Sequence, residues 1–284
     1  KIAAEFALAE GGGNVLEDEG VSIVGIQTAE KKPRRATLVA RGTAGHGSVP
    51  RQDNAVTAIS RAVAKMGAWQ TEMRLNATTR AYFDRMAAMS DPEDAWRYRN
   101  IENPEETEAI QQYFLENYPY HYSVLRSSVV PTIINGGFRK NVIPSEASAV
   151  LDIRMLPDED VDAFYDQMRE IIADPNVEVV PEPVYRPESP PSPVDNEMFE
   201  TLERVANRMY PDATVLPTMS TGATDMAQVR AKGVPAYGLG AIRSVEEINS
   251  GNGAHGDNER VSEESVRQLV QFVWHTIIEI GATR

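Results

Sequence analysis

The sequence has 284 residues, of which 42% are hydrophobic and 25% are charged, and its net charge is −14. This is the composition of a globular protein that is long enough for two domains of ordinary size. The acidic balance disfavours nucleic acid and anionic membrane surfaces as partners, because both bind through basic patches. The sequence contains no cysteine, which excludes disulfides and thiolate metal sites. Any metal must therefore be held by His, Asp or Glu.

The first segment of the chain predicts a strand that ends at a carboxylate. Residues 6–9 are apolar, and Glu10 and three glycines follow them. A charge at the carboxyl end of a strand, next to glycines, is a common geometry of ligand sites in open α/β sheets. A glutamate that happens to precede a turn is the alternative, and both interpretations stay open. A second strand is predicted at 21–28, and the basic cluster at 31–35 indicates a solvated connection at a domain boundary.

From residue 36 onward the pattern predicts a ferredoxin-like unit. Its order is strand, helix, strand, strand, helix, strand, which is the split βαβ arrangement. The predicted strands lie at 37–41, 129–134, 147–155 and 177–180, and the predicted helices at 54–66 and 161–172. An insertion at about 70–127 is rich in charge, Tyr and Met and predicts two or three helices. Insertions of this length usually cover another part of the protein.

The proline-rich stretch 181–193 indicates a return to the first domain. After it, helices and strands alternate in the manner of a doubly wound α/β sheet. The helices are predicted at 196–210, 224–232 and 261–280, and the strands at 214–216 and 234–237. We therefore predict an α/β domain made of 1–35 and 184–284, with an α+β domain of 36–183 inserted into it.

Two of the four histidines are candidates for chemistry. His121 lies among tyrosines and His275 lies in the last helix, so we expect both to be structural. His46 and His255 lie in glycine-rich loops, at 45–50 and 251–257, where polar side chains more often serve a site than a core. For His255 taken alone, a solvated loop histidine is the simpler interpretation.

Three further places carry polar groups in suggestive positions. Thr224 or Asp225 could cap the helix that follows 220–225, or the backbone N–H groups there could hold an anion. Asn141 follows a glycine-containing turn. Arg154 lies on a largely apolar strand, where it either pairs with a nearby aspartate or clamps a carboxylate through two hydrogen bonds. A Gly-x-Ser-x-Gly elbow is absent from the sequence, which disfavours a serine hydrolase.

Six short motifs occur together in a recognisable order. They lie at 10–12, 45–50, 137–144, 153–154, 222–225 and 254–256. In this order and rough spacing they resemble the dinuclear zinc amidohydrolases that include acetylornithine deacetylase, succinyl-diaminopimelate desuccinylase and carboxypeptidase S. The helical insertion is most similar to the carboxypeptidase S and N-acyl-amino-acid hydrolase branch.

The resemblance implies a zinc-binding α/β domain with an inserted ferredoxin-like lid, and a homodimer that forms through the lid. It implies two zinc ions per complete active site. Glu10 matches a ligand of one zinc, and His255 matches a ligand of the other.

The resemblance also implies roles for the remaining motif residues. His46 matches the lid histidine that polarises the scissile carbonyl, often in the active site of the partner subunit. Asn141 and Arg154 match lid residues that bind the substrate, with Arg154 at its carboxylate. Gly222 and Thr224 match a loop that lines the substrate pocket.

The chain departs from the family pattern in its metal ligands. The family's His-x-Asp motif, bridging aspartate and Glu-Glu pair all lie upstream of the position that Glu10 matches, and none of them is in these residues. We therefore expect an α/β domain that is incomplete at its N-terminus, and a chain that is inactive alone because catalytic zinc normally takes three protein ligands.

These expectations lead to two hypotheses. The chain is the carboxyl-terminal portion of a zinc-dependent carboxypeptidase or N-acyl-amino-acid amidohydrolase, which acts on a small peptide or N-acyl amino acid. The alternative is a non-catalytic module that dimerises or binds carboxylates.

Overall fold

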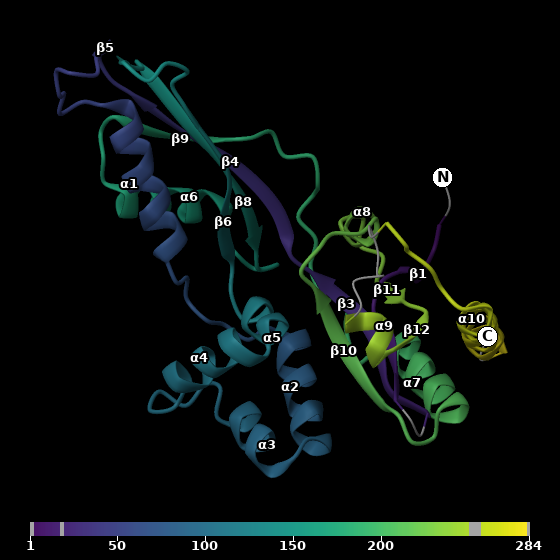
Figure 1. Cartoon of the computed structure of the whole chain (residues 1–284). Coiled ribbons are helices and arrows are strands. Elements are labelled where there is room, and N and C mark those ends of the chain that lie inside the picture. The colour runs from purple at the N-terminus through teal and green to yellow at the C-terminus, as the bar shows by residue number, and fades with distance from the viewer. Residues whose placement is uncertain (1–2, 18–19, 250–256, 283–284) are drawn as a thin grey trace. The chain divides into compact units, whose positions relative to one another are not determined.

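The computed structural model describes residues 3–17, 20–249 and 257–282 (Figure 1). The chain divides into two compact units. Unit 1 consists of Lys1–Glu30, Leu75–Leu125 and Glu188–Arg284, and unit 2 consists of Lys31–Arg74 and Arg126–Pro187. The helical insertion is thus grouped with unit 1. The zinc-binding and lid roles of the two parts stay predictions. Among the described residues, no helix is long and apolar enough to cross a membrane.

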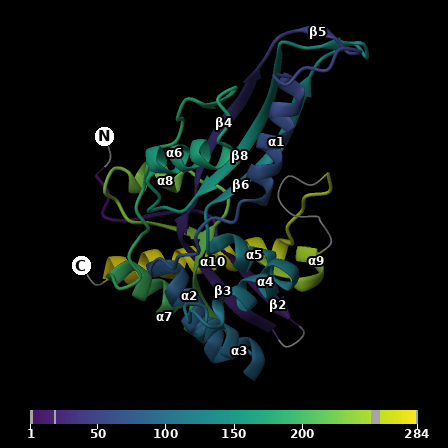
Figure 2. The ribbon, with the colours of Figure 1, turned by 90° about the vertical axis from the view of Figure 1, so that its left-hand side faces the viewer.

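Unit 2 is built on a four-stranded antiparallel sheet with two helices on one face (Figure 2). The strand order β6-β8-β4-β9 is that of a ferredoxin-like fold, and it confirms the predicted fold class for this part of the chain. The elements are β4 (Lys32–Arg41), α1 (Ala55–Ala68), β6 (Ser128–Gly136), β8 (Glu146–Met155), α6 (Val161–Ile172) and β9 (Val177–Pro181).

The core of unit 2 follows from the alternation of β8 and the apolar faces of the two helices. Helix α1 begins after Asn54, whose side chain accepts hydrogen bonds from the first turn. On α1, Ile59 and Met66 are buried, whereas Val56 and Val63 are only partly buried, because small alanines form the centre of the packed face. The buried partners on the sheet are Ala36, Leu38, Ala40, Ala147, Ala149, Leu151 and Ile153.

The basic cluster at 31–35 is not the solvated connection that the sequence predicts. Strand β3 (Gly20–Glu30) and β4 flank Lys31, and Lys31, Lys32 and Arg34 are all at most 5% exposed. The ammonium group of Lys32 donates a hydrogen bond to the carbonyl of Glu159 at 2.6 Å. Burial, with Arg154 and Arg126 nearby, lowers the pKa of Lys31 to about 7. Long aliphatic stems let these side chains pack in strands although their charges suggest a surface loop.

Beyond the ends of β4 and β8, two short strands form a separate ribbon. Strand β5 (Gly45–His46) pairs with β7 (Val142–Ile143) in an antiparallel ladder. In Figure 2, β5 lies at the far end of β4. We call residues 44–50 together with 137–142 the tip of unit 2. Neither short strand is predicted from the sequence.

Unit 1 contains a six-stranded mixed sheet. The parallel pairs agree with the predicted α/β class, but β3 pairs antiparallel with two neighbours, so the sheet is not purely doubly wound. β2 ends at Glu17 and β3 begins at Gly20, and strands joined this closely pair antiparallel. The strands are β1 (Ala7–Glu10), β2 (Gly13–Glu17), β3, β10 (Thr214–Ser220), β11 (Ala236–Leu239) and β12 (Ile242–Ser244).

Two long helices of unit 1 pack against each other and contribute to its core. Helices α7 (Glu197–Met209) and α10 (Glu263–Ala282) lie at the predicted places, and Phe199, Leu202 and Phe272 are buried with strand residues such as Ile26. The predicted helix at 224–232 is only the five-residue α8 (Met226–Arg230). Another short helix, α9 (Val245–Asn249), follows β12.

The helical insertion forms four helices. They are α2 (Ala77–Met89), α3 (Pro92–Arg99), α4 (Thr107–Asn117) and α5 (Pro119–Val124). Helix α3 begins after Asp91, whose side chain caps it, and Pro92 occupies the first turn. Asn103 does not begin a helix, although a proline and two acids follow it. Its side chain accepts a hydrogen bond from the backbone N–H of Glu105 and closes a turn, and α4 begins only at Thr107.

His121 of α5 lies at the centre of an aromatic cluster inside this insertion. It is 7% exposed and packs against rings from α2, α3 and α4, namely those of Phe83, Tyr98 and Phe114. The Tyr82 hydroxyl lies 3.0 Å from its Nε2 atom. Burial lowers the pKa of His121 to about 4.

This buried imidazole makes unit 1 less stable in acid. Below pH 6.5 the imidazole of His121 is protonated in the unfolded chain, whereas in the folded unit it stays neutral down to about pH 4. The free energy of unfolding therefore falls as the pH is lowered through this window. The full difference is on the order of 3 kcal/mol. Urea unfolding at pH 7 and pH 4.5 measures it. His121→Phe is the matched control, because it removes the titrating group and should flatten the pH dependence over this range. An unchanged slope in that variant contradicts the assignment.

Candidate active site

Glu10 is the last residue of β1, and a glycine turn follows it. Gly11, Gly12 and Gly13 all have positive φ angles, which side chains other than glycine rarely adopt. A Cβ atom on Gly12 would collide with the carbonyl oxygens of Gly25 and Gly238 on the neighbouring strands. The glycines therefore let the backbone pass close to the sheet, and the exposed Glu10 lies at its edge.

A buried polar network connects this turn to the loop before α8. The backbone N–H of Gly12 donates to the side-chain oxygen of Gln27 at 3.3 Å, and Gln27 donates to the Glu30 carboxylate at 3.3 Å. Glu30 also accepts hydrogen bonds from the backbone N–H of Thr224 at 3.1 Å and from its hydroxyl at 2.6 Å. The guanidinium of Arg230 lies 2.9 Å from Glu30, and both side chains are 2% exposed.

In this network, the predicted site residue Thr224 makes structural contacts. Thr224 is 9% exposed, and its polar groups bond to Glu30 rather than facing an open pocket. Gly222 lies in the same loop, where its N–H donates to the hydroxyl of Ser220 at 3.0 Å. The side chain of Asp225 makes no capping bond to α8, and a helix of five residues has too weak a dipole to hold an anion by itself.

His46 and Asn141 lie side by side at the tip of unit 2. The N–H of Gly47 donates to the Asn141 carbonyl at 2.8 Å, and both predicted site residues are exposed. Phe138 belongs to the same tip, and its side chain is 88% exposed. The ribbon β5–β7 thus brings together two residues that lie far apart in the chain.

Ser48 fixes the proton position on His46. Its backbone N–H lies 3.1 Å from Nδ1 of His46, and its hydroxyl lies 2.7 Å from the same atom. Because a backbone N–H can only donate, Nδ1 is the acceptor and the neutral ring carries its proton on Nε2. His46 therefore presents an N–H donor at the tip. A donor of this kind stabilises a developing oxyanion.

The loop that carries His46 is tied down at its base. Asp53 accepts a hydrogen bond from the N–H of Thr43 at 3.0 Å and pairs with Arg51 at 3.0 Å. These hydrogen bonds, chiefly the one with Thr43, lower the pKa of Asp53 to about 2. The carboxylate is consequently ionised at neutral pH and holds both sides of the loop.

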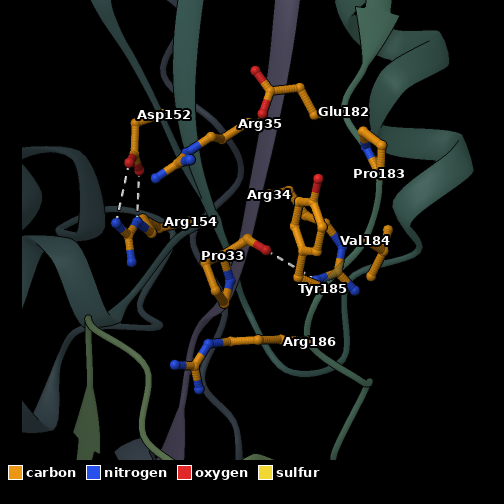
Figure 3. A pocket seen from close by; sticks show the side chains of 10 residues that line it. All are labelled: Pro33, Arg34, Arg35, Asp152, Arg154, Glu182, Pro183, Val184, Tyr185 and Arg186. Carbon is orange, nitrogen blue, oxygen red and sulfur yellow. Dashed lines mark hydrogen bonds and ion pairs between the residues drawn. The ribbon is translucent and has the colours of Figure 1, made fainter.

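Arg154 lies at the other end of β8, beside a small cavity (Figure 3). Asp152 binds it through two hydrogen bonds, at 2.6 Å to Nε and 3.0 Å to one terminal nitrogen. This is the aspartate pair that the sequence leaves open as one alternative. The pair fixes the orientation of the guanidinium, and Nη1 still has its N–H groups for an anion.

The structure does not bring all predicted residues of unit 2 to one place. In the ladder, Arg154 pairs with Pro33 and Glu146 pairs with Arg41, so eight residues of β8 separate the two ends. At the rise of a β-strand this is about 26 Å, and His46 lies beyond the far end. Within one chain, Arg154 is therefore too far from His46 for both to contact one small substrate.

Comparison with known families shows that residues 28–180, more than half of the chain, match a peptidase dimerisation domain, M20_dimer. The chain belongs to the M20 peptidase family. Its antiparallel sheet, apart from the last residue of β9, and helices α1 and α6 fall within the matched range. The resemblance to carboxypeptidase S and the N-acyl-amino-acid hydrolases is confirmed at this level.

The relatives of this M20 chain include hydrolases of both kinds. A probable carboxypeptidase S-like 2 of Dictyostelium discoideum is 27% identical over 233 residues, which cover 82% of this chain and 44% of that protein. An N-fatty-acyl-amino acid synthase/hydrolase PM20D1 of Xenopus tropicalis is 25% identical over 261 residues, covering 89% and 48%.

A solved structure shows the same fold. An M20 family metallo-carboxypeptidase, Sso-CP2 from Sulfolobus solfataricus, matches with a TM-score of 0.59 and 18% identity over 96% of this chain and 62% of that one. The M20 chain spans about half the length of the curated relatives named above.

The described residues of the M20 chain do not complete a metal site. Within 3–17, 20–249 and 257–282, no three His, Asp or Glu side chains gather in a way that could hold a metal ion. Glu10 is described, but His255, the other predicted ligand, lies outside the described residues. Catalytic zinc normally takes three protein ligands, so Glu10 alone does not fit this ion.

Several residues around the predicted site have no signal in the sequence. Glu30, Gln27 and Arg230 are ordinary polar residues until the fold buries them together. Ser48 has a weak signal, because it follows His46 by two residues within a turn. The sequence predicts Arg35 in a solvated cluster, and only the strand register places it opposite Asp152, two residues from Arg154.

Proposed function

We propose that the protein that carries this chain hydrolyses an amide or peptide bond next to a free α-carboxylate, with zinc, as a carboxypeptidase or N-acyl-amino-acid amidohydrolase. The observation that carries this proposal is the fixed, half-buried guanidinium of Arg154 beside a small cavity. Arginine held in this way is suited to carboxylates, because its donors match both carboxylate oxygens. The names of the relatives favour the same bond and the same substrate class.

In this proposal each predicted site residue of unit 2 has one task. Arg154 binds the substrate carboxylate. His46 donates from Nε2 to the carbonyl oxygen, whose negative charge grows as the bond is attacked, and this polarises the scissile carbonyl. Asn141, next to His46, supplies an amide that can bind the substrate backbone.

The predicted site residues of unit 1 bind the metal and position a loop. Glu10 is a proposed metal ligand, together with His255 and ligands that are not among these residues. Gly222 allows the backbone of its loop to approach the substrate, and Thr224 keeps that loop in place through Glu30. Thr224 thus acts by positioning.

The 26 Å between the two ends of β8 favours a homodimer with shared sites. His46 and Asn141 of one subunit would then serve the substrate that Arg154 of its partner holds. Strand β6 is the proposed dimer contact, since it is an edge of its sheet and exposes Val130, Ile133 and Ile134. An edge strand of nine residues with exposed apolar side chains is rarely left uncovered in solution.

Metal removal tests the proposed reaction. We expect the protein to release amino acid from N-acyl amino acids or dipeptides, to lose this activity after chelation, and to regain it with zinc. Hydrolysis that survives chelation contradicts the zinc requirement. Binding of the same compounds without hydrolysis, at any zinc concentration, would favour the carboxylate-binding module instead.

A further inference from the structure

We propose that Arg35 binds a second carboxylate next to Arg154, so that the preferred substrate carries an acidic side chain. This inference rests on the proposed function and names a substrate class for the same site. It assigns a role in specificity to Arg35, for which the resemblance implies none.

The first support is the position of Arg35 in the sheet. Arg35 on β4 pairs directly with Asp152 on β8, and Arg154 is two residues further along β8. Directly opposite residues project to the same face of an antiparallel sheet, and so do residues two apart on one strand. The two arginines and the aspartate therefore share the face of the sheet opposite to the buried residues of β8. Figure 3 shows Arg35 extending toward the Asp152–Arg154 pair.

The second support is the pairing within this group. Asp152 directs both of its oxygens to Arg154, at 2.6 and 3.0 Å. In the described part of the chain, the guanidinium of Arg35 makes no hydrogen bond or ion pair of its own. Arg35, Arg154 and Asp152 together thus carry one net positive charge, which a bound anion can neutralise.

The third support is the cavity itself. It has a volume of about 170 Å³, and its lining contains four arginines and two acids. Arg34 neighbours Arg35 on β4 and projects to the opposite, buried face of the sheet, so Arg35 and Arg154 are the strand arginines that share the outward face with Asp152. The arginines are Arg34, Arg35, Arg154 and Arg186, and the acids are Asp152 and Glu182.

The size of the cavity favours a short group. Part of its wall is apolar and is made by Pro33, Pro183, Val184 and Tyr185. A volume of about 170 Å³ is too small for a long acyl chain. An aspartate or glutamate side chain fits the charge and needs little space.

The experiment compares two substrates that differ only in charge. For the protein with N-acetylglutamate and N-acetylglutamine, we expect kcat/KM to favour the acidic substrate by at least about tenfold. Arg35→Gln should remove most of this preference by lowering kcat/KM for N-acetylglutamate alone. Arg154→Gln should lower kcat/KM for both substrates. Arg169→Gln on α6, which removes an exposed arginine that pairs with Asp166, is the matched control and should change neither.

Binding separates this inference from the proposed function. Titration of glutarate, butyrate and inorganic phosphate, followed by the arginine Nε–H signals in NMR spectra, does not require turnover. We expect glutarate to bind more tightly than either of the others, and Arg35→Gln to abolish this difference. Equal binding of glutarate and butyrate, or tighter binding of phosphate, overturns the assignment. Glutarate binding without any hydrolysis supports it and instead contradicts the proposed reaction.

Discussion

Replacement of Glu30 by leucine is expected to destabilise unit 1 by about 3–5 kcal/mol, because it leaves a buried arginine without its counter-charge. Arg230 is 3% exposed, and its burial lowers the pKa while the charge of Glu30 opposes that effect. The substitution also removes the acceptor for the N–H and hydroxyl of Thr224. Urea unfolding followed by the near-ultraviolet signal of the unit measures the loss.

A double-mutant cycle is the control for this prediction. Arg230→Met alone should also destabilise, since it leaves Glu30 as an unpaired buried charge. The double variant Glu30→Leu with Arg230→Met should recover part of the loss, because an apolar pair of similar volume avoids both desolvation costs. A double variant whose loss equals the sum of the two single losses would show that the two side chains are not coupled.

Replacement of His46 by alanine is expected to lower kcat by about 10²–10³-fold, which is the usual effect of removing one oxyanion donor. His46 is exposed and lies at the tip, so the fold should not change. KM should change much less than kcat, because the donor acts on charge that develops during the reaction. Steady-state kinetics with an N-acyl amino acid measure both constants.

Two further variants test this role. His275→Ala removes an exposed histidine of α10 and should leave kcat unchanged. Ser48→Ala removes the hydroxyl near Nδ1 but keeps the backbone donor, so we expect a loss well below that of His46→Ala. If His46→Ala affects KM alone, the residue binds substrate and does not stabilise the oxyanion.

Local patterns were enough to predict the main strands and helices of unit 2. The alternation of Ala147 to Ile153 and the apolar faces of α1 and α6 follow the periods of a strand and of helices. Gly-rich loops likewise marked His46 and Asn141 as candidates. The family match over 28–180 confirms the fold that these patterns predict.

Features that depend on distant contacts were missed. The sequence predicts Lys31 and Arg34 at the surface. Their burial was missed because β4 packs against β8, which lies more than a hundred residues away in the chain. The buried partners of Glu30 come from residues 224 and 230, and no local pattern connects them. The distance between Arg154 and His46 became clear only from the strand register.

The strand register also changes how the predicted site is understood. The sequence motifs group His46, Asn141 and Arg154 as lid residues, and the sheet places Arg154 at the opposite end from the other two. A homodimer resolves this separation if each active site takes its carboxylate clamp from one subunit and its oxyanion donor from the other. We therefore expect each active site to contain residues of both subunits.

Mixing two inactive variants tests this claim most directly. His46→Ala and Arg154→Ala proteins are each expected to lose most of their activity as homodimers. After they are unfolded together and refolded at equal amounts, random association should restore about a quarter of the wild-type sites, since each mixed dimer contains one site with both residues intact. Recovery of activity toward this level is the predicted result. No recovery, in a mixture shown to contain mixed dimers, would mean that His46 and Arg154 serve the same site from one chain, and would contradict the account.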